Sequence, residues 1–420
     1  MSFASSLQIL KHNEFRWFIY ARFFITLAIQ MQMSAIYLQI YYEYAEKDEE
    51  ELTLGLIGLT EVIPFIMTSF FSGHIADIVS RKKIIVTGCL ALLLGSLFLW
   101  AYSSNYFSFL QVLGSAALFS VVFIFGIIRA FLAAATQPFM SQLVERSQYA
   151  QATTWNTTVW HTGAILGPVL AGLIYGYQNA NHADWCYATN CILFCGAVFF
   201  YLRIRSKPIP EKLKDETLIQ SLTSGLKFVY NNNMILSALS LDMFAVLFGG
   251  AVAIIPAYTD KVLGLGPEAY GFLRTAPAIG AVLTSFILVF KQPGKRAGFD
   301  LLWTVAAFGV CTILFALCTN FWLAFAMLFL TGAFDNVSVV VRHTILQLMT
   351  PDNMRGRVSA VNSIFVGSSN EIGAFESGAA ARLMGLVPSI VFGGVMTIAV
   401  VLGVNKLNPK LKELDLKKLE

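Results

Sequence analysis

Ionisable side chains within long apolar stretches are the residues of this sequence that could do chemistry. Placing such a group in hydrocarbon costs about 2.5 to 3.5 kcal/mol or more, so each needs a partner, a water-filled cavity or an interface. A buried carboxylate can also carry a proton when its surroundings change. The candidates for proton coupling are Asp242, Glu371, Glu376, Arg129, Asp335 and Glu61. For each, the alternative is a structural ion pair or a hydrogen bond between helices.

Asp242 is the first candidate proton carrier. It lies about nine residues, or roughly 13 Å, inside its apolar segment, which is too deep for a carboxylate to reach the surface. Glu371 and Glu376 are five positions apart and so point about 140° apart around a helix. Arg129 and Asp335 are predicted to be partners.

A second group of polar side chains recurs every four residues and forms one helical stripe. It consists of Arg22, Thr26, Gln30 and Ser34. Such a stripe is expected to line a cavity, although Arg22 is near enough to the start of its segment to reach the membrane surface instead. His161, Asn362 and Ser369 are further candidates for substrate contacts. For His161, a polar packing role is the alternative.

The composition indicates how these residues are carried. Of 420 residues, 56% are hydrophobic and only 13% charged, and the mean hydropathy is +0.66, which excludes a set of soluble domains. A bilayer-spanning helix needs about 20 apolar residues. Twelve spans are expected, at 15–41, 53–76, 84–102, 108–136, 153–176, 184–203, 233–258, 269–290, 299–317, 320–341, 358–381 and 386–404. The fold class is therefore an all-α membrane protein.

The basic residues predict the sidedness of the connectors. Most of the 29 Lys and Arg fall in connectors on one side, and the other side holds only Lys47, Lys261 and Arg382. Positive residues concentrate on the cytoplasmic side, so both termini are expected there. The first span is expected to be retained, since no short apolar region with a cleavage site precedes it. The acidic run Glu46–Glu51 is interpreted as a solvated loop.

The longest connector predicts the domain organisation. It runs from 205 to 232 and contains Pro208, Pro210 and then leucines at helical spacing, as in a helix that lies on the cytoplasmic interface. We expect a first bundle of six helices at 1–204, the linker at 205–232, a second bundle of six at 233–405 and a tail at 406–420.

An internal repeat relates the two predicted bundles. At an offset of 206 positions, three pairs of identical residues align, namely Asn156 with Asn362, Gly167 with Gly373 and Gly172 with Gly378. Arg129 and Asp335 fall on the same offset. Repeats of equal membrane orientation are related by a pseudo-two-fold axis along the membrane normal, with substrate bound near the midplane between them.

Two motifs carry a family resemblance. The connector after the second span holds Gly73, Asp77, Arg81 and Lys82, which combine a close helix approach with charges at a helix end. In the fifth span, small residues four apart allow backbone contact, and a proline bends the helix. This second motif consists of Gly163, Gly167, Pro168 and Gly172.

With these motifs, the sequence resembles the major facilitator superfamily, and within it the branch of the enterobactin exporter and drug efflux proteins. The resemblance implies twelve helices in two six-helix bundles. It also implies that the Gly73 to Lys82 motif gates the cytoplasmic side, and that the Gly163 to Gly172 motif favours antiport. Arg129 resembles the family's buried arginine, but Leu132 and Ala133 replace the Gln and Gly that often follow it.

The predicted function is secondary active export of a small amphipathic molecule, such as a siderophore or a drug, by proton antiport with alternating access. The alternatives are an importer or symporter, or a lysophospholipid flippase, of the same fold. The expected partners are the substrate, protons and the lipid bilayer. A monomer in the bacterial inner membrane is predicted.

Other functions are disfavoured by the motifs and composition. No P-loop, HExxH or GxSxG sequence occurs, so neither ATP hydrolysis nor an intramembrane enzyme is expected, and no cofactor is predicted. The six Cys fall in or beside apolar segments and predict neither a disulfide framework nor a metal site. A net charge of +4 does not indicate nucleic-acid binding.

Overall fold

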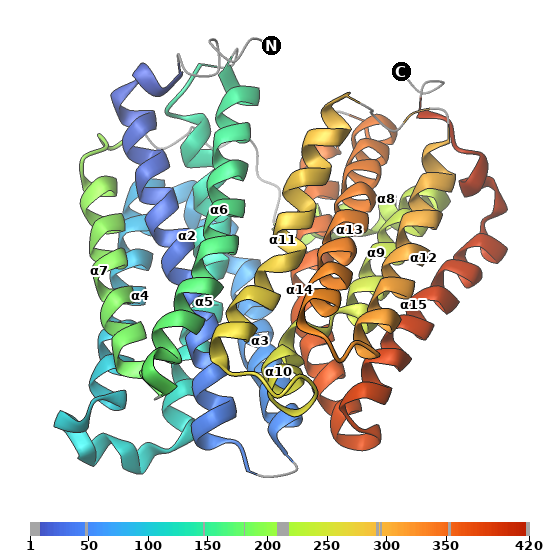
Figure 1. Ribbon diagram of the computed structural model, residues 1–420. Helices are drawn as coiled ribbons and strands as arrows, with labels where there is room; N and C mark the ends of the chain where they lie inside the picture. The colour runs from blue at the N-terminus through green and yellow to red at the C-terminus, as the bar shows by residue number, and fades with distance from the viewer. Residues whose placement is uncertain are drawn as a thin grey trace. The chain divides into compact units, whose positions relative to one another are not determined.

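The computed structural model describes residues 9–46, 49–145, 148–179, 181–207, 218–290, 294, 296–351 and 354–416. All regular structure within these ranges is helical (Figure 1). The long helices of the first half are α2 (Asn13–Gln39), α3 (Glu50–Ile78), α4 (Arg81–Ser103), α5 (Ser115–Ser141), α6 (Tyr149–Tyr175) and α7 (Ala183–Leu202). Those of the second half are α9 (Asn233–Gly249), α11 (Pro267–Phe290), α12 (Ala297–Ala316), α13 (Phe321–Met349), α14 (Arg355–Met384) and α15 (Leu386–Leu407).

Eleven helical stretches among the described residues are long and apolar enough to cross a membrane. One of them, Asn233–Lys261, joins α9 to the short helices η6 (Ala251–Ile254) and α10 (Ile255–Lys261). The predicted span at 358–381 coincides with α14, a helix of 30 residues that does not qualify by composition. Its serines, asparagines and two glutamates lower its hydropathy, so the expected count of twelve spans is met in helix length but not in composition.

The described helices form two compact units. Unit 1 comprises Met1–Tyr44, Ile63–Asp215 and Gly266–Gly271, and unit 2 comprises Ala45–Val62, Glu216–Leu265 and Phe272–Glu420. Two helices are divided, α3 after Val62 and α11 after Gly271. The predicted domains at 1–204, 205–232, 233–405 and 406–420 follow the chain instead and remain a prediction.

Unit 1 is built around α2. This helix packs on α6 and α7, and α4 packs on α7 and α5. Gly163 and Gly167 allow α6 to lie against the backbone of α2, since a Cβ added at Gly167 would lie 2.6 Å from Gln30 Cβ and 2.8 Å from Met31 N. Side chains cannot be accommodated at these two positions without separating the helices.

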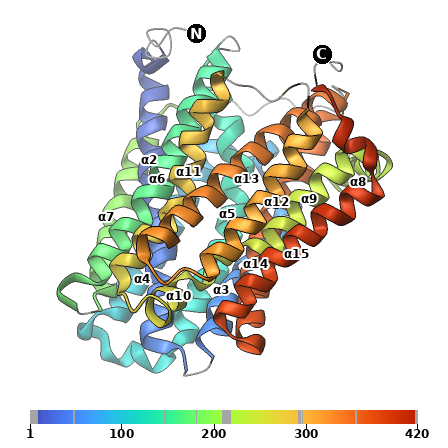
Figure 2. The ribbon, with the colours of Figure 1, turned by 45° about the vertical axis from the view of Figure 1, so that its right-hand side comes forward.

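Unit 2 has a continuous apolar core where α9, α12, α13 and α15 meet (Figures 1 and 2). Ile235, Leu301, Val341 and Ile345 are fully buried there. The helix predicted in the linker forms as α8 (Leu218–Asn231) and packs on α14, where Arg357 donates a hydrogen bond of 3.0 Å to Ser224 Oγ. Pro208 and Pro210 lie outside the described residues. The placement of α8 on a membrane interface remains a prediction.

Candidate functional site

A charged cluster lies inside unit 2. Asp242 on α9 and Arg342 on α13 form an ion pair, and only 4% and 2% of their respective surfaces are exposed. Asp335, two turns before Arg342 on α13, lines a cavity together with Asp242. A buried ion pair is stable only while both partners are present, because removing one leaves an uncompensated charge. Asp242 therefore holds Arg342 in place.

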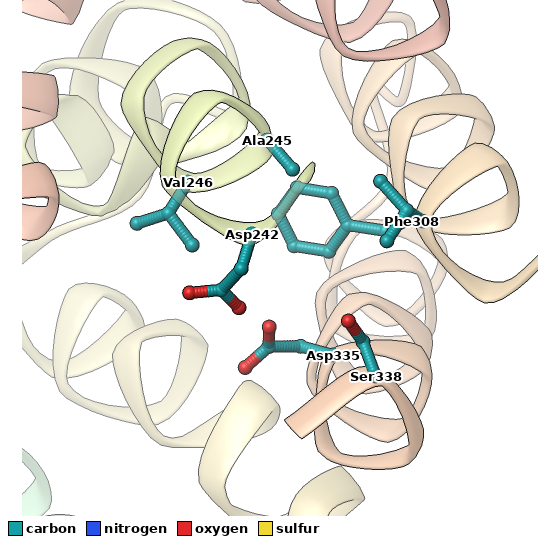
Figure 3. A pocket seen from close by; sticks show the side chains of 7 residues that line it. Asp242, Ala245, Val246, Phe308, Asp335 and Ser338 are labelled. Carbon is teal, nitrogen blue, oxygen red and sulfur yellow. The ribbon is translucent and has the colours of Figure 1, made fainter. Parts of the chain in front are cut away.

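The spacing of residues on α13 explains this arrangement. Asp335, Ser338 and Arg342 are three and four positions apart and so share one face of the helix, opposite α9. Figure 3 shows the carboxylates of Asp242 and Asp335 pointing toward each other. Among the described residues, Ser338 Oγ and Arg342 Nε have no hydrogen-bond partner. Hydrogen-bond donors therefore remain available beside two carboxylates.

The cavity between these side chains is small and mostly apolar. The cavity has a volume of about 10 Å³ and so has room for about one water molecule. Val246, Val305 and Phe308 form the apolar walls. One guanidinium can neutralise only one of the two carboxylates, so a proton bound by the pair removes the remaining charge. The cluster is therefore neutral with one bound proton and carries one net negative charge without it.

The other candidates for proton coupling lie elsewhere. Arg129 stacks on the ring of Phe65 in unit 1, with 5.6 Å from Cζ to the ring centroid, whereas Asp335 belongs to unit 2. Their pairing remains a prediction. Glu61 is buried in the part of α3 that belongs to unit 2. On α14, Glu371 and Glu376 are both partly exposed.

The polar stripe of α2 faces α6. Arg22 Nε donates a hydrogen bond of 3.1 Å to Asn156 Oδ1 on α6. Thr26 contacts Gly163 and Gln30 contacts Gly167, so both help to pack the two helices. Ser34 Oγ donates to Gln30 O, one turn back in its own helix. The predicted stripe is thus largely a helix interface, and Arg22 is the member with a directed polar contact.

The remaining candidates for substrate contacts are dispersed. His161 on α6 lies edge-on to Trp160, and its Nδ1 is buried with no hydrogen-bond partner in the described part of the chain. On α14, Asn362 Oδ1 is likewise buried and lacks a hydrogen bond among the described residues. Ser369 Oγ donates to Val366 O. Nothing brings these three side chains together within the described residues of one unit.

The predicted gating motif has two bases with well-defined contacts. Arg81 donates to Pro138 O near the end of α5, and Lys82 donates to Leu202 O and Ile204 O at the end of α7, over 3.3, 3.1 and 2.5 Å. Cations are favoured at helix C-termini, where carbonyl groups lack partners. Gly73 lies within α3, and the side chain of Asp77 lies outside the described side chains. The two bases thus tie helix ends together within unit 1.

The predicted packing motif has a counterpart at the repeat offset. A Cβ at Gly172 on α6 would lie 2.5 Å from Pro267 O and 3.0 Å from Gly271 Cα, within unit 1. A Cβ at Gly378 on α14 would lie 2.3 Å from Glu51 O and 2.8 Å from Gly55 Cα, within unit 2. The aligned glycines therefore make equivalent backbone contacts. Pro168 shares the seam, since its carbonyl lies against Gly271.

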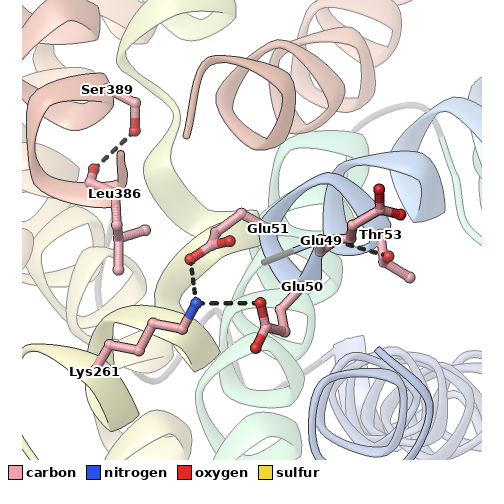
Figure 4. Close-up of polar contacts among 7 residues, drawn as sticks. All are labelled: Glu49, Glu50, Glu51, Thr53, Lys261, Leu386 and Ser389. Carbon is pink, nitrogen blue, oxygen red and sulfur yellow. Dashed lines mark hydrogen bonds and ion pairs between the residues drawn. The ribbon is translucent and has the colours of Figure 1, made fainter. Parts of the chain in front are cut away.

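The interpretation of Glu46–Glu51 as a solvated loop was wrong for its last two residues, Glu50 and Glu51. Glu50 begins α3, and Lys261 on α10 pairs with Glu50 and Glu51 over 3.2 and 2.8 Å, as Figure 4 shows. Arg382 on α14 pairs with Glu49. Acidic residues are favoured at a helix start, and both bases lie within unit 2. The partners of Lys261 and Arg382 could not be predicted from the sequence, because they lie far away along the chain.

A polar network in unit 1 was also missed. Gln39 Nε2 donates to Glu43 Oε2 and to Ser103 Oγ over 2.9 Å, and Tyr187 OH donates to Gln39 Oε1 over 2.8 Å. Tyr175 OH donates to Glu43 Oε1 over 2.8 Å. Glu43 belongs to a π-helical turn, η2 (Ile40–Tyr44). Only the spacing of Gln39 and Glu43 by four positions, which places them on one helix face, could have indicated their contact from the sequence.

Comparison with known proteins gives the family. The family model of the Major Facilitator Superfamily matches residues 18–374 of this chain. The staphyloferrin A transporter of Staphylococcus aureus is 23% identical over 367 residues, which cover 86% of this chain and 88% of that protein. The multidrug resistance protein MdtG of Salmonella paratyphi C is 24% identical over 84% of this chain and 83% of its own length.

Two further similarities agree with this result. The enterobactin exporter EntS of Escherichia coli is 25% identical over 59% of this chain and 58% of its own length. A bacterial homologue of the human lysosomal transporter Spinster, solved in an inward-facing and unoccupied conformation, matches with a TM-score of 0.70 at 14% identity. This match covers 98% of this chain and 99% of that one. Through its matching family description, its helical architecture and these relatives, the chain belongs to the major facilitator superfamily and is a multi-pass membrane transport protein, not an enzyme.

Proposed function

We propose that this chain exports a small amphipathic molecule, such as a siderophore or a drug, in exchange for protons. The names of the relatives support this substrate class, since they include a staphyloferrin A transporter, a multidrug resistance protein and an enterobactin exporter. The observation that carries proton coupling is the cluster of Asp242, Arg342 and Asp335 in the core of unit 2.

Within this cluster, Asp335 is the proposed proton carrier. Asp242 is already neutralised by Arg342, so the charge of Asp335 has no counterpart when it is ionised. A proton on Asp335 makes the cluster neutral and favours a conformation in which the cavity is closed to water. Loss of that proton favours a hydrated conformation. A proton can drive alternating access only through such a difference in free energy between states.

Export is proposed over import because the Gly163 to Gly172 motif resembles that of antiporters. An importer or symporter, or a lysophospholipid flippase, is the alternative. The proposed setting is the bacterial inner membrane, with both termini in the cytoplasm and the chain monomeric. Labelling of single cysteines introduced near each terminus in intact and in opened cells tests the orientation.

The experiment for direction uses everted membrane vesicles with an imposed pH gradient. Ethidium serves as a drug-like probe and ferric and iron-free catecholate siderophores as the alternative class. An exporter accumulates its probe inside everted vesicles when the interior is acidic, and collapse of the gradient releases it. Probe entry that requires the opposite gradient would favour a symporter.

The experiment for the carrier compares Asp335→Asn with Asp300→Asn, which removes a carboxylate at the start of α12, outside the cavity. We expect counterflow, the exchange of labelled for unlabelled probe without net proton movement, to survive in Asp335→Asn while gradient-driven accumulation falls at least tenfold. Asp300→Asn should keep both. Glu371→Gln and Glu376→Gln are measured in parallel, and a loss confined to either one would move the proton site to α14.

A further inference from the structure

We infer that Arg22 in unit 1 is the centre of an anion-binding site, and that the exported molecule carries a carboxylate or similar oxyanion. The direction of transport in this inference rests on the proposed function, whereas the site itself is defined by the structure of unit 1. No carboxylate compensates this guanidinium among the described residues. A negatively charged ligand would supply the missing counter-charge.

The geometry of Arg22 leaves its binding end available. Its Nε donates to Asn156 Oδ1 over 3.1 Å, which fixes the plane of the guanidinium with only one of its five N–H groups. Its partner is a neutral amide, and no ion pair to Arg22 occurs within the described residues. The side chain is partly exposed, whereas Phe18 and Ile25 on either side of it are buried. The two Nη atoms therefore form a fork of the kind that binds oxyanions in a bidentate manner.

The surrounding groups are donors. Thr26, one turn along α2, is 4% exposed, and its Oγ1 has no hydrogen-bond partner among the described residues. Tyr201 on α7 packs edge-on against Phe18, one turn before Arg22, with ring centroids 6.3 Å apart, and its buried hydroxyl also has no hydrogen-bond partner in the described part of the chain. Hydroxyl and guanidinium groups donate hydrogen bonds to an anion, and without an adjacent carboxylate no negative charge repels it.

The position of the site suits substrate capture. Arg22 lies nine residues from the start of α2, or about 13 Å along the helix, on the side where Glu14 pairs with Lys207. This is the end proposed to be cytoplasmic, from which an exporter must load. The competing explanation is a guanidinium that only reaches water at the membrane surface. That explanation needs no ordering by Asn156 and predicts no preference for oxyanions.

The test measures equilibrium binding by the purified full-length protein. Thermal unfolding is followed by tryptophan fluorescence with citrate, with benzoate, with neutral benzamide and with chloride at matched ionic strength. We expect a saturable rise in Tm with the carboxylates only. The concentration for half of that rise should increase at least tenfold in Arg22→Gln and less in Arg22→Lys. Arg203→Gln is the matched control, since Arg203 stacks on the exposed Phe199 and on Trp17 at the same end of unit 1.

Two outcomes would overturn the inference. One is an equal response to carboxylates in wild type and Arg22→Gln, and the other is no response to carboxylates beyond that to chloride. Should Arg22→Gln fail to fold, Asn156→Leu keeps the charge but removes its orientation, and its carboxylate response should still weaken. Binding needs no pH gradient, so a failure of proton coupling at Asp335 leaves this result unchanged. Normal carboxylate binding without gradient-driven transport would reject the exporter and keep the anion site.

Discussion

Arg22 in unit 1 and Arg342 in unit 2 show two ways to hold a guanidinium in a membrane protein. Arg342 is 2% exposed and is compensated by Asp242, with a second carboxylate beside it. Arg22 is partly exposed and bonded to the amide of Asn156. We call the first the closed arrangement, because its guanidinium is paired inside the protein and the charge of the cluster can change only by uptake or loss of a proton. The second has no counter-charge among the described residues, and a bound anion is the partner proposed for it.

The largest effect is expected from breaking the closed arrangement. Asp242→Asn leaves Arg342 buried without its counter-charge, and we expect a loss of about 3 to 5 kcal/mol in the free energy of unfolding. The measurements are the abundance of the variant in membranes and the thermal unfolding of the purified variant. The double variant Asp242→Asn with Arg342→Gln should recover most of the loss. A stable single variant would show that water reaches Arg342, and the contrast with Arg22 would then disappear.

The helix seam that supports Arg22 is expected to come next. Gly167→Leu forces α6 away from α2, because even a Cβ would lie 2.6 Å from Gln30 Cβ. We expect a loss of about 1 to 3 kcal/mol or more and a weakened hydrogen bond between Arg22 and Asn156. Leu166→Ala is the neighbouring control at a side chain that is 40% exposed. Similar melting temperatures for the two variants would contradict the packing role of Gly167.

The helices and the family were predictable from the sequence because apolar length and spaced glycines act locally. Each predicted span overlaps a described helix, but α5 begins at Ser115 rather than at 108 and α13 continues to Met349 rather than ending at 341. The aligned pair Gly172 and Gly378 makes equivalent contacts. The pairing of Asp242 with Arg342 could not be predicted, since the two side chains are 100 positions apart and Arg342 falls just after the predicted span 320–341. Spacing along one helix cannot say which helix lies opposite. For the same reason the partners of Lys261 and of Gln39 were missed.

A smaller effect is expected at the neutral partner of Arg22. Asn156→Ala removes one hydrogen bond from a group that keeps access to water, so the free energy of unfolding should fall by only about 1 kcal/mol. This value is to be compared with that of Asp242→Asn under the same conditions. A loss as large as that of Asp242→Asn would mean that Arg22 is sealed in the protein, and the proposed anion site would lose its entrance.

The smallest effect is expected at Lys261, which has two carboxylate partners but is exposed to water. Its side chain is 38% exposed, so Lys261→Gln should cost below about 1 kcal/mol despite two carboxylate partners. The difference from wild type should shrink further as salt is raised from 0.1 to about 1 M, where screening is strong. A salt-independent loss would place this pair with the closed arrangement of Arg342.

The division of α3 between the two units has a mechanical consequence. The break falls after Val62, and Pro64 follows two residues later inside the helix. Proline has no N–H, so the carbonyl of Thr60 lacks its helical hydrogen bond and the helix is weakest there. In α11 the break falls at Gly271, a residue that also lowers helix stiffness. Each divided helix therefore carries, at or next to its break, a residue that makes bending there cost less than in an uninterrupted helix.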